Sequence, residues 1–420
     1  MIKKFSEKTG RLLKNLNTSK TILIVVIIGL VLRIGFVFLF PDMGEGRLMD
    51  SFKYKKVAIH LMQGRGFCEY IRKPSAFAPP LYPVFLAGVF SVFGINSVIV
   101  KIIQAFLGVS IIPMIFLMGK TLFNKETGLI AAGILAVYPD LIVISAYLYT
   151  ETLYLFFSMI AFYFLIKGFK QEFGFLLWIM SGFFLGLGLL TRHILILFPV
   201  FILSLTIIFK GYRHLIKKVA IMALVCYAVI TPWIIRNYIQ FHEFIPIARG
   251  VRAGLWVGSN VEKKGEYMYS ETRNLANKEA GNFDTLIERD NKLFGKAIER
   301  IVHDPVTYVS ISGKKFFQFF FKFYKSVPRG QPRASDFKVL IVLAASYAFL
   351  LLFTITGVFY AIKNKERLIV VYSVILYSGL VHSMTIVVPR YRIPLYPFFV
   401  ILAAYGIFSL INIKNSTDNR

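Results

Sequence analysis

Apolar segments long enough to cross a lipid bilayer recur from one end of this 420-residue chain to the other. A membrane-spanning helix needs roughly 17–25 predominantly apolar residues, because each residue advances the helix by only about 1.5 Å. Segments of that kind cover residues 21–40, 97–117, 128–146, 150–166, 173–190, 193–209, 219–235, 339–362, 368–388 and 393–413. Hydrophobic residues make up 56% of the sequence and charged residues only 17%, which is unlike a soluble domain. We therefore predict an all-α polytopic membrane protein with about ten transmembrane helices plus juxtamembrane helices.

The distribution of charge bears on the partners. The net charge is +27, but the basic residues lie between apolar segments and form no basic stripe with stacking aromatics. This pattern argues against nucleic acid and favours contacts with membrane lipids or phosphate. The first apolar segment, 21–40, is too long for the core of a signal peptide, and Pro41-Asp42 follows it where a cleavage site would need small residues. We expect it to remain as the first transmembrane helix.

The short apolar piece 79–93 decides the topology. If it only dips into the outer surface, the short basic loops all fall on the cytoplasmic side, as the positive-inside rule requires. These loops carry Lys120, Lys125, Lys167, Lys170, Lys210, Arg213, Lys217, Lys218, Lys363, Lys365 and Arg367. If the piece crosses, they all move outside. We therefore predict a multi-pass protein of the plasma (inner) membrane with both termini cytoplasmic.

This topology gathers polar residues at the outer face. They are Asp50, Glu151, Arg192, His193, Arg236, Arg390 and Arg392. Polar groups at one depth on one side favour an extracytoplasmic site, whereas scattered ones would favour polar contacts between helices. Arg33 lies inside the first span, where an unpaired charge costs about 3 kcal/mol, so we expect it to have an internal partner or to face a cavity.

The chain divides into three predicted parts. Residues 1–235 form an N-terminal catalytic transmembrane module with a first outer loop at 41–96, and residues 337–420 form C-terminal transmembrane helices. Residues 236–336 form an outer juxtamembrane amphipathic region. Within it, 283–302 has the apolar spacing of an amphipathic helix. Residues 306–324 mix phenylalanines with lysines, which is typical of a helix lying in the membrane interface.

Four motifs occur in order along the chain. They are Asp50 and Tyr54 with Gly64-Arg65-Gly66-Phe67 and Pro79-Pro80-Leu81-Tyr82-Pro83; Tyr138-Pro139-Asp140 with Tyr149-Thr150-Glu151; Thr231-Pro232-Trp233 with Arg236-Asn237-Tyr238 and Leu255 to Asn260; and Pro389-Arg390-Tyr391-Arg392-Ile393-Pro394. Together they resemble the polyprenyl-phosphate-sugar glycosyltransferases of the GT-C fold, the group of the protein mannosyltransferases (glycosyltransferase family 39) and the lipid A aminoarabinose transferase. The resemblance runs from the first span to the last.

The resemblance implies a membrane glycosyltransferase that moves a hexosyl or pentosyl group from a polyprenyl-phosphate carrier to a glycan, lipid or protein acceptor. An acceptor that attacks the sugar must lose a proton, and Asp50, which matches the family's first-loop aspartate, is the implied general base. The alternative for Asp50 is a solvated carboxylate that caps a helix over 52–62.

Glu151 matches a position that is acidic in relatives of the oligosaccharyltransferases, which implies a second catalytic carboxylate or a ligand for a divalent metal ion. Two departures leave the metal open: residue 149 is Tyr, and Ser51 follows Asp50 where protein mannosyltransferases have a second acid. Asp140 is an alternative partner, although the turn after Pro139 favours an exposed residue.

Arginines suit the departing phosphate because the guanidinium fork matches phosphate oxygens and stays charged. The implied phosphate-binding residues are Arg390, Arg392, Arg192, Arg236 and Lys101, and the implied substrate-pocket residues are Tyr54, Tyr391 and His193. Interfacial anchoring and structural clamping remain the alternatives for the arginines, an ordinary interfacial position for Tyr54, and a bystander role for His193.

Two other functional classes stay open. A polysaccharide polymerase or ligase of the envelope also has many spans and outer arginines, but carries its large loop late in the chain and has no first-loop aspartate. A flippase or transporter usually shows internal repeats and broken helices at the midplane, and we find no repeat in this sequence.

Overall fold

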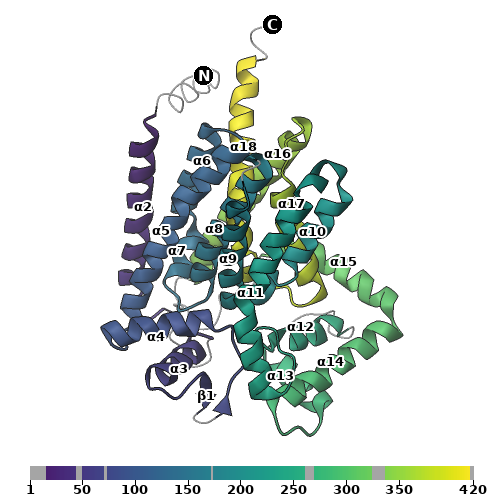
Figure 1. Cartoon of the computed structure of the whole chain (residues 1–420). Coiled ribbons are helices and arrows are strands. Elements are labelled where there is room, and N and C mark those ends of the chain that lie inside the picture. The colour runs from purple at the N-terminus through teal and green to yellow at the C-terminus, as the bar shows by residue number, and fades with distance from the viewer. Residues whose placement is uncertain are drawn as a thin grey trace.

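The computed structural model describes residues 16–43, 50–70, 73–171, 174–260, 269–323 and 336–416. The basic N-terminal residues before residue 16 lie outside these ranges. Most helices run side by side in one bundle (Figure 1). They are α2 (Thr18–Leu39), α5 (Ser97–Leu122), α6 (Lys125–Val137), α7 (Pro139–Ser145), α8 (Glu151–Gln171), α9 (Leu176–Thr191), α10 (Phe198–Ile208), α11 (Ile216–Phe241), α16 (Asp336–Lys363), α17 (Ile369–Met384) and α18 (Tyr396–Ser416).

The remaining elements lie mostly at one end of the bundle, which we call the α3 end (Figure 1). They are α3 (Asp50–Met62), the antiparallel strands β1 (Cys68–Tyr70) and β2 (Lys73–Pro74), α4 (Leu81–Phe93), α12 (Gly250–Ser259), α13 (Tyr269–Ala280), α14 (Leu286–His303) and α15 (Pro305–Phe321). Short 3-10 helices join some of the long ones: η1 (His193–Leu195), η2 (Lys210–Leu215) and η3 (Pro389–Leu395).

The predicted all-α polytopic membrane fold is confirmed, but the count of about ten spans is not. Six of the described helices are long and apolar enough to cross a membrane, or seven if the bent pair α6 and α7 is taken as one span. Three further predicted spans correspond to α9, η1 with α10, and α17, which are shorter apolar helices. A helix of 16 residues, such as α9, extends only about 24 Å, which is less than the hydrocarbon thickness of a bilayer.

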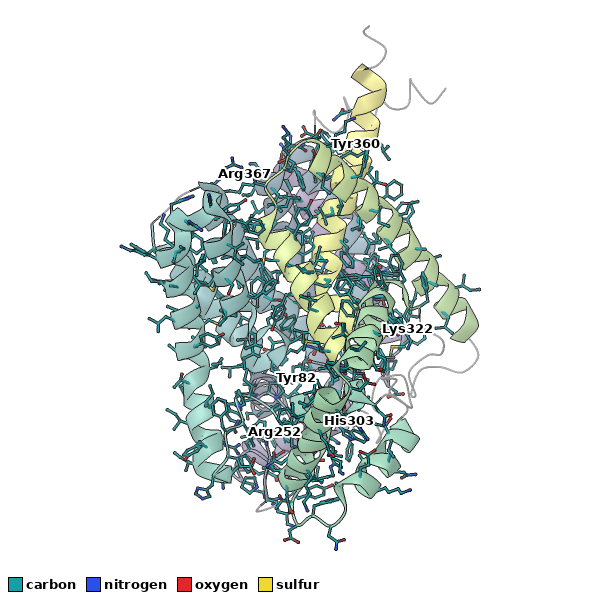
Figure 2. All side chains as sticks on the ribbon, turned by 90° about the vertical axis from the view of Figure 1, so that its right-hand side faces the viewer. Tyr82, Arg252, His303, Lys322, Tyr360 and Arg367 are labelled. Carbon is teal, nitrogen blue, oxygen red and sulfur yellow. The ribbon has the colours of Figure 1, made fainter. Side chains whose placement is uncertain are left out.

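The two ends of the bundle carry different elements and different loops. Helix α2 begins and α18 ends at the same end, which we call the terminal end, and α4 lies across the opposite end (Figure 1). Lys170, His214 and Arg367 from three basic loops line one cavity of about 230 Å³. Figure 2 shows Arg367 at the terminal end and Arg252 toward the other. The basic loops therefore gather away from α3, while the side of the membrane that each end faces stays a prediction.

Helix α18 is the centre of the bundle. In the most apolar stretch of η3 and α18 together, 78% of residues are buried, against 17% for the peripheral α2. Close packing against α16 depends on Gly357, because a Cβ atom there would lie 1.9 Å from the carbonyl oxygen of Leu402. Small residues at such crossings allow transmembrane helices to approach closely. Arg33 of α2 has the internal partners that the sequence led us to expect, since its Nη1 donates to the carbonyl oxygen of Ala136 at 3.0 Å.

The span predicted at 128–146 is broken in two. Helix α6 ends at Val137, α7 begins at Pro139, and their axes differ by 52°. Proline has no N–H to continue the helical hydrogen bonds, which explains the break. The prediction that Asp140 is an exposed turn residue is wrong, because Asp140 lies in the first turn of α7 and is only 5% exposed.

The region 236–336, where it is described, has a small core of its own around Trp256 and Leu293. The helix predicted at 283–302 is confirmed as α14, which begins at Leu286 after the side chain of Thr285 caps the N–H of Glu288. Its inward residues include Leu293 and Ala297, whereas much of the predicted apolar face, including Phe294, is exposed. The helix predicted at 306–324 corresponds to α15, and its place in the membrane interface stays a prediction.

Candidate functional site

Two carboxylates begin two helices at the α3 end. Asp50 is the first residue of α3, and Glu151 is the first residue of α8. A helix N-terminus carries partial positive charge, which favours an acidic side chain in the first turn. Since Lys170 at the far end of α8 donates to the carbonyl oxygen of Leu122 and lines the cavity at the terminal end, Glu151 lies at the opposite end of its helix. The two residues differ in exposure, because the Asp50 side chain is 49% exposed and that of Glu151 is 0% exposed.

Two arginines converge on these carboxylates. Arg390 Nε donates to Glu151 Oε1, and Arg390 Nη1 lies 3.6 Å from Asp50 Oδ2. Arg192 Nη1 lies 2.7 Å from the same Glu151 oxygen and donates to Thr150 Oγ1 at 3.2 Å. We call Asp50, Glu151, Arg192 and Arg390 the carboxylate–arginine cluster. A charge buried this deeply is tolerable only when it is paired, and Glu151 has two cationic partners.

Tyrosine rings enclose the cluster. The guanidinium carbon of Arg390 lies 3.8 Å from the centroid of the Tyr149 ring, a cation–π contact. Tyr54, from the second turn of α3, is buried and packs edge-to-face on Tyr82 with centroids 5.3 Å apart. Burial raises the pKa of the Tyr54 phenol well above its usual value, and the charge of Asp50 adds to the shift. Burial likewise raises the pKa of the Tyr149 phenol, so both rings are neutral and line the site.

The other side of the cluster is formed by α17 and η3. Arg192 lies 5.8 Å from the centroid of the Tyr391 ring, which in turn stacks on His382 at 5.0 Å. Arg192, Tyr391 and His382 also line a cavity of about 10 Å³, which is room for one water molecule. His382 was not predicted; its signal in the sequence is an ionisable residue inside an apolar helix.

A second unpredicted residue, Gln104 of α5, holds the turn before Glu151. Gln104 Nε2 donates to the carbonyl oxygens of Ser145 at 3.1 Å and Tyr147 at 2.7 Å, and Gln104 Oε1 accepts from the Tyr82 hydroxyl at 2.7 Å. These bonds fix the chain between α7 and α8, where Tyr149 and Glu151 lie. In the sequence, the signal for Gln104 is an amide side chain inside an apolar span. In the structure this amide is fully buried.

Three predicted phosphate ligands lie elsewhere, and the geometry does not support that role for them. Arg392 is 1% exposed and donates to the carbonyl oxygen of Phe320 at 3.0 Å. Arg236 donates to the carbonyl oxygens of Phe67 and Ser75 and stacks on Trp233, so it clamps the first outer loop. Lys101 donates to the carbonyl oxygen of Pro41.

His193 follows Arg192 at the start of η1. Its Nδ1 atom is buried, and no group in the described part of the chain hydrogen-bonds to it. His193 therefore lies beside the cluster, and its place in a substrate pocket stays a prediction.

The site does not fit a metal centre. Asp50 and Glu151 are separated by the guanidinium of Arg390, which contacts both. Among the residues described, no group of three or more His, Cys, Asp or Glu side chains could hold a metal ion. Hard divalent cations take about six oxygen ligands, and repulsion from Arg390 would oppose any cation placed between these two carboxylates.

Comparison with known proteins supports the resemblance seen in the sequence. Residues 78–235 match the profile of the family described as dolichyl-phosphate-mannose-protein mannosyltransferase. That match includes Glu151 and Arg192 but ends before Arg390 and begins after Asp50. No curated protein matches the chain.

Solved structures extend the similarity to nearly the whole chain. The archaeal oligosaccharyltransferase AglB from Archaeoglobus fulgidus, in complex with an inhibitory peptide and a dolichol-phosphate, matches with a TM-score of 0.56 and 13% identity over 97% of this chain and 52% of its own. The complex of the A. fulgidus oligosaccharyltransferase with Zn and sulfate matches with a TM-score of 0.51 and 14% identity, over 94% of this chain and 50% of its own. ArnT from Cupriavidus metallidurans bound to undecaprenyl phosphate matches with a TM-score of 0.44 and 15% identity, over 96% of this chain and 80% of its own.

The chain thus spans about half the length of the oligosaccharyltransferase that it matches. Its predicted resemblance to glycosyltransferases of the GT-C fold is confirmed, and so is the fold itself.

Proposed function

We propose that this protein transfers a sugar from a polyprenyl-phosphate carrier to an acceptor, with Asp50 as the general base. The observation that carries the proposal is the carboxylate–arginine cluster at one end of a GT-C bundle. Catalysis needs a base that an acceptor can reach, and Asp50 is the exposed member of the cluster. The A. fulgidus oligosaccharyltransferase of the same fold binds a dolichol-phosphate and a peptide, which supports a lipid-linked donor and a separate acceptor here.

The reaction can be written on this geometry. A hydroxyl or similar group of the acceptor attacks C1 of the sugar, its proton passes to Asp50, and the bond between C1 and the phosphate oxygen breaks. The polyprenyl phosphate leaves with an additional negative charge. Arg390 and Arg192 lie next to Asp50 and offer N–H donors to that charge, because guanidinium groups bind phosphate oxygens in pairs. Glu151 holds both arginines in position.

The orientation follows from the same proposal. The basic loops at the terminal end face the cytoplasm, and the carboxylate–arginine cluster faces the other side of the plasma membrane. A carrier lipid then presents its phosphate at the level of the cluster while its chain stays in the bilayer. Transfer experiments must identify the sugar and the acceptor.

The direct test is transfer by the purified protein, given a panel of polyprenyl-phosphate sugars and acceptor extracts from the envelope. We expect Asp50→Asn to lower kcat by roughly 100-fold or more, as loss of a general base does. The matched control is Glu126→Gln, which removes a carboxyl from the first turn of α6 at the terminal end and should leave the rate unchanged. Equal rates for wild type and Asp50→Asn, with both proteins folded, would rule out Asp50 as the base.

A further inference from the structure

The space between Asp50 and Glu151 is filled by a side chain of the protein. Arg390 reaches it from η3, near the other end of the sequence, and contacts both carboxylates. We infer that the Arg390 guanidinium takes the place of a divalent cation in this site, so that the enzyme handles its lipid phosphate with built-in cations alone. The catalytic role of Arg390 rests on the proposed function, whereas the exclusion of a cation from the site does not.

Three contacts fix the Arg390 guanidinium. Its Nε and Nη1 atoms face Glu151 and Asp50, and its central carbon lies 3.8 Å from the centroid of the Tyr149 ring. Arg192 saturates the same oxygen of Glu151 from the other side, at 2.7 Å. A metal ion would therefore compete with two arginines for Glu151 and would find an aromatic ring, and no third carboxylate, at position 149.

The charges point the same way. The cluster holds two carboxylates and two guanidinium groups, so its formal charges cancel. A divalent ion inserted between the carboxylates would bring the net charge of the cluster to +2 in a site where Glu151 is fully enclosed, or it would displace Arg390 from both of its acidic partners among the described residues. A buried guanidinium without its carboxylate is strongly unfavourable. The cluster is thus complete without a metal.

The arrangement also explains how the arginine can serve the reaction. A guanidinium carries five N–H donors in a rigid fork, and the contacts with the two carboxylates use only Nε and Nη1. A phosphate oxygen that approaches from the side of the exposed Asp50 can meet the remaining face of the fork. Arg390 then links the general base to the leaving group, which is the role that a metal ion fills in sites where carboxylates coordinate one.

The inference predicts a gain of metal binding when Arg390 is removed. Thermal unfolding of the purified full chain in detergent would be followed with increasing Mn²⁺. We expect no Asp50-dependent change in Tm for the wild type. For Arg390→Gln, which fills the space without the charge, we expect a saturable rise in Tm, because an ion that binds only the folded state stabilises it. Asp50→Asn combined with Arg390→Gln should abolish that rise, and Arg236→Gln should not produce one.

Only the part of each Tm shift that depends on Asp50 tests the inference, so Mn²⁺ bound elsewhere on the chain does not affect the result. A wild type that gains Tm with Mn²⁺ and loses the gain in Asp50→Asn would overturn it. So would Arg390→Gln without any response, since the freed carboxylates would then not form a cation site. If Arg390→Gln does not fold, the electron paramagnetic resonance signal of Mn²⁺ titrated into the wild type and Asp50→Asn decides: an Asp50-dependent bound fraction contradicts the inference, and its absence supports it. None of these measurements uses sugar transfer, so failure of the proposed function would be seen separately.

Discussion

Arg390 and Arg392 are separated by one residue, yet they enter two different regions of the molecule. Arg390 joins the carboxylate–arginine cluster, where its acidic partners are in direct contact. Arg392 joins a second buried group, which we call the Asp140 cluster and define as Asp140, Arg392, Tyr138 and Tyr347. Each arginine lies on a tyrosine ring, at 3.8 Å for Tyr149 under Arg390 and 4.0 Å for Tyr347 under Arg392.

The two clusters differ in whether a ligand can reach their charged groups. The carboxylate–arginine cluster ends in Asp50, whose side chain is half exposed at the α3 end. Every charged member of the Asp140 cluster is enclosed, and three of its polar atoms have no hydrogen-bond partner among the described residues: Asp140 Oδ2, Arg392 Nε and the Tyr138 hydroxyl. A fully enclosed network specifies packing, whereas one that opens to the outside can meet a substrate. This contrast can be tested residue by residue.

The largest expected effect follows from loss of the buried acid that holds two arginines. Glu151→Ala should lower the free energy of unfolding by about 3–5 kcal/mol, because Arg192 and Arg390 would be left with uncompensated charge. Sugar transfer should be lost together with the stability. The measurement is unfolding in detergent, followed by circular dichroism.

Asp140→Ala is the matched control, since it removes an enclosed carboxyl that forms no ion pair within the described part of the chain. Its cost should be smaller, about 1–3 kcal/mol. If Asp140→Ala destabilises as much as Glu151→Ala, the two clusters do not differ in the way proposed.

A smaller effect separates the two arginines. Arg392→Met should lower the free energy of unfolding by about 1–3 kcal/mol, because the carbonyl oxygen of Phe320 loses its charged donor and keeps that of the Tyr347 hydroxyl. The KM for the lipid-linked donor should remain that of the wild type. Arg390→Met should instead reduce kcat/KM for the donor, which a steady-state assay at several donor concentrations would show. A rise in donor KM for Arg392→Met as large as that for Arg390→Met would restore the sequence hypothesis that both bind phosphate.

The sequence predicted the neighbourhood of the site better than its contacts. Hydropathy, the positive-inside rule and the family motifs placed Asp50, Glu151, Arg192 and Arg390 at one end of the bundle, and the structure brings these four together. Hydropathy could not settle the count of spans, because α9, α10 and α17 are apolar but too short to cross alone.

The assignment of Arg392 shows where motif reasoning stops. Within a 3-10 helix, side chains two residues apart leave the axis about 120° apart, so a motif that names both arginines does not say which one faces the carboxylates. Asp140 was misjudged for a related reason. A proline before an acid is typical of exposed turns, but here Pro139 opens a second helix inside the bundle, and tertiary packing buries the carboxyl.

The smallest expected effect concerns the two rings beneath the arginines. Tyr149→Leu removes the aromatic surface under Arg390, and an exposed to partly buried cation–π contact contributes about 0.5–1.4 kcal/mol. If that contact holds Arg390 in its working position, kcat/KM should fall roughly two- to tenfold, by the usual conversion of free energy to rate. Tyr149→Phe keeps the ring and should behave as the wild type.

Tyr347→Leu makes the same change under Arg392 at a nearly equal distance. It should lower the Tm, because it also removes the hydrogen bond from the Tyr347 hydroxyl to the carbonyl oxygen of Phe320 at 2.6 Å. It should leave kcat/KM unchanged, because the ring lies in the enclosed cluster. Transfer rates and melting curves measured on the wild type, Tyr149→Leu and Tyr347→Leu would therefore separate an arginine that acts in the site from one that stabilises the bundle. A loss of rate in Tyr347→Leu equal to that in Tyr149→Leu would mean that the two clusters act as one.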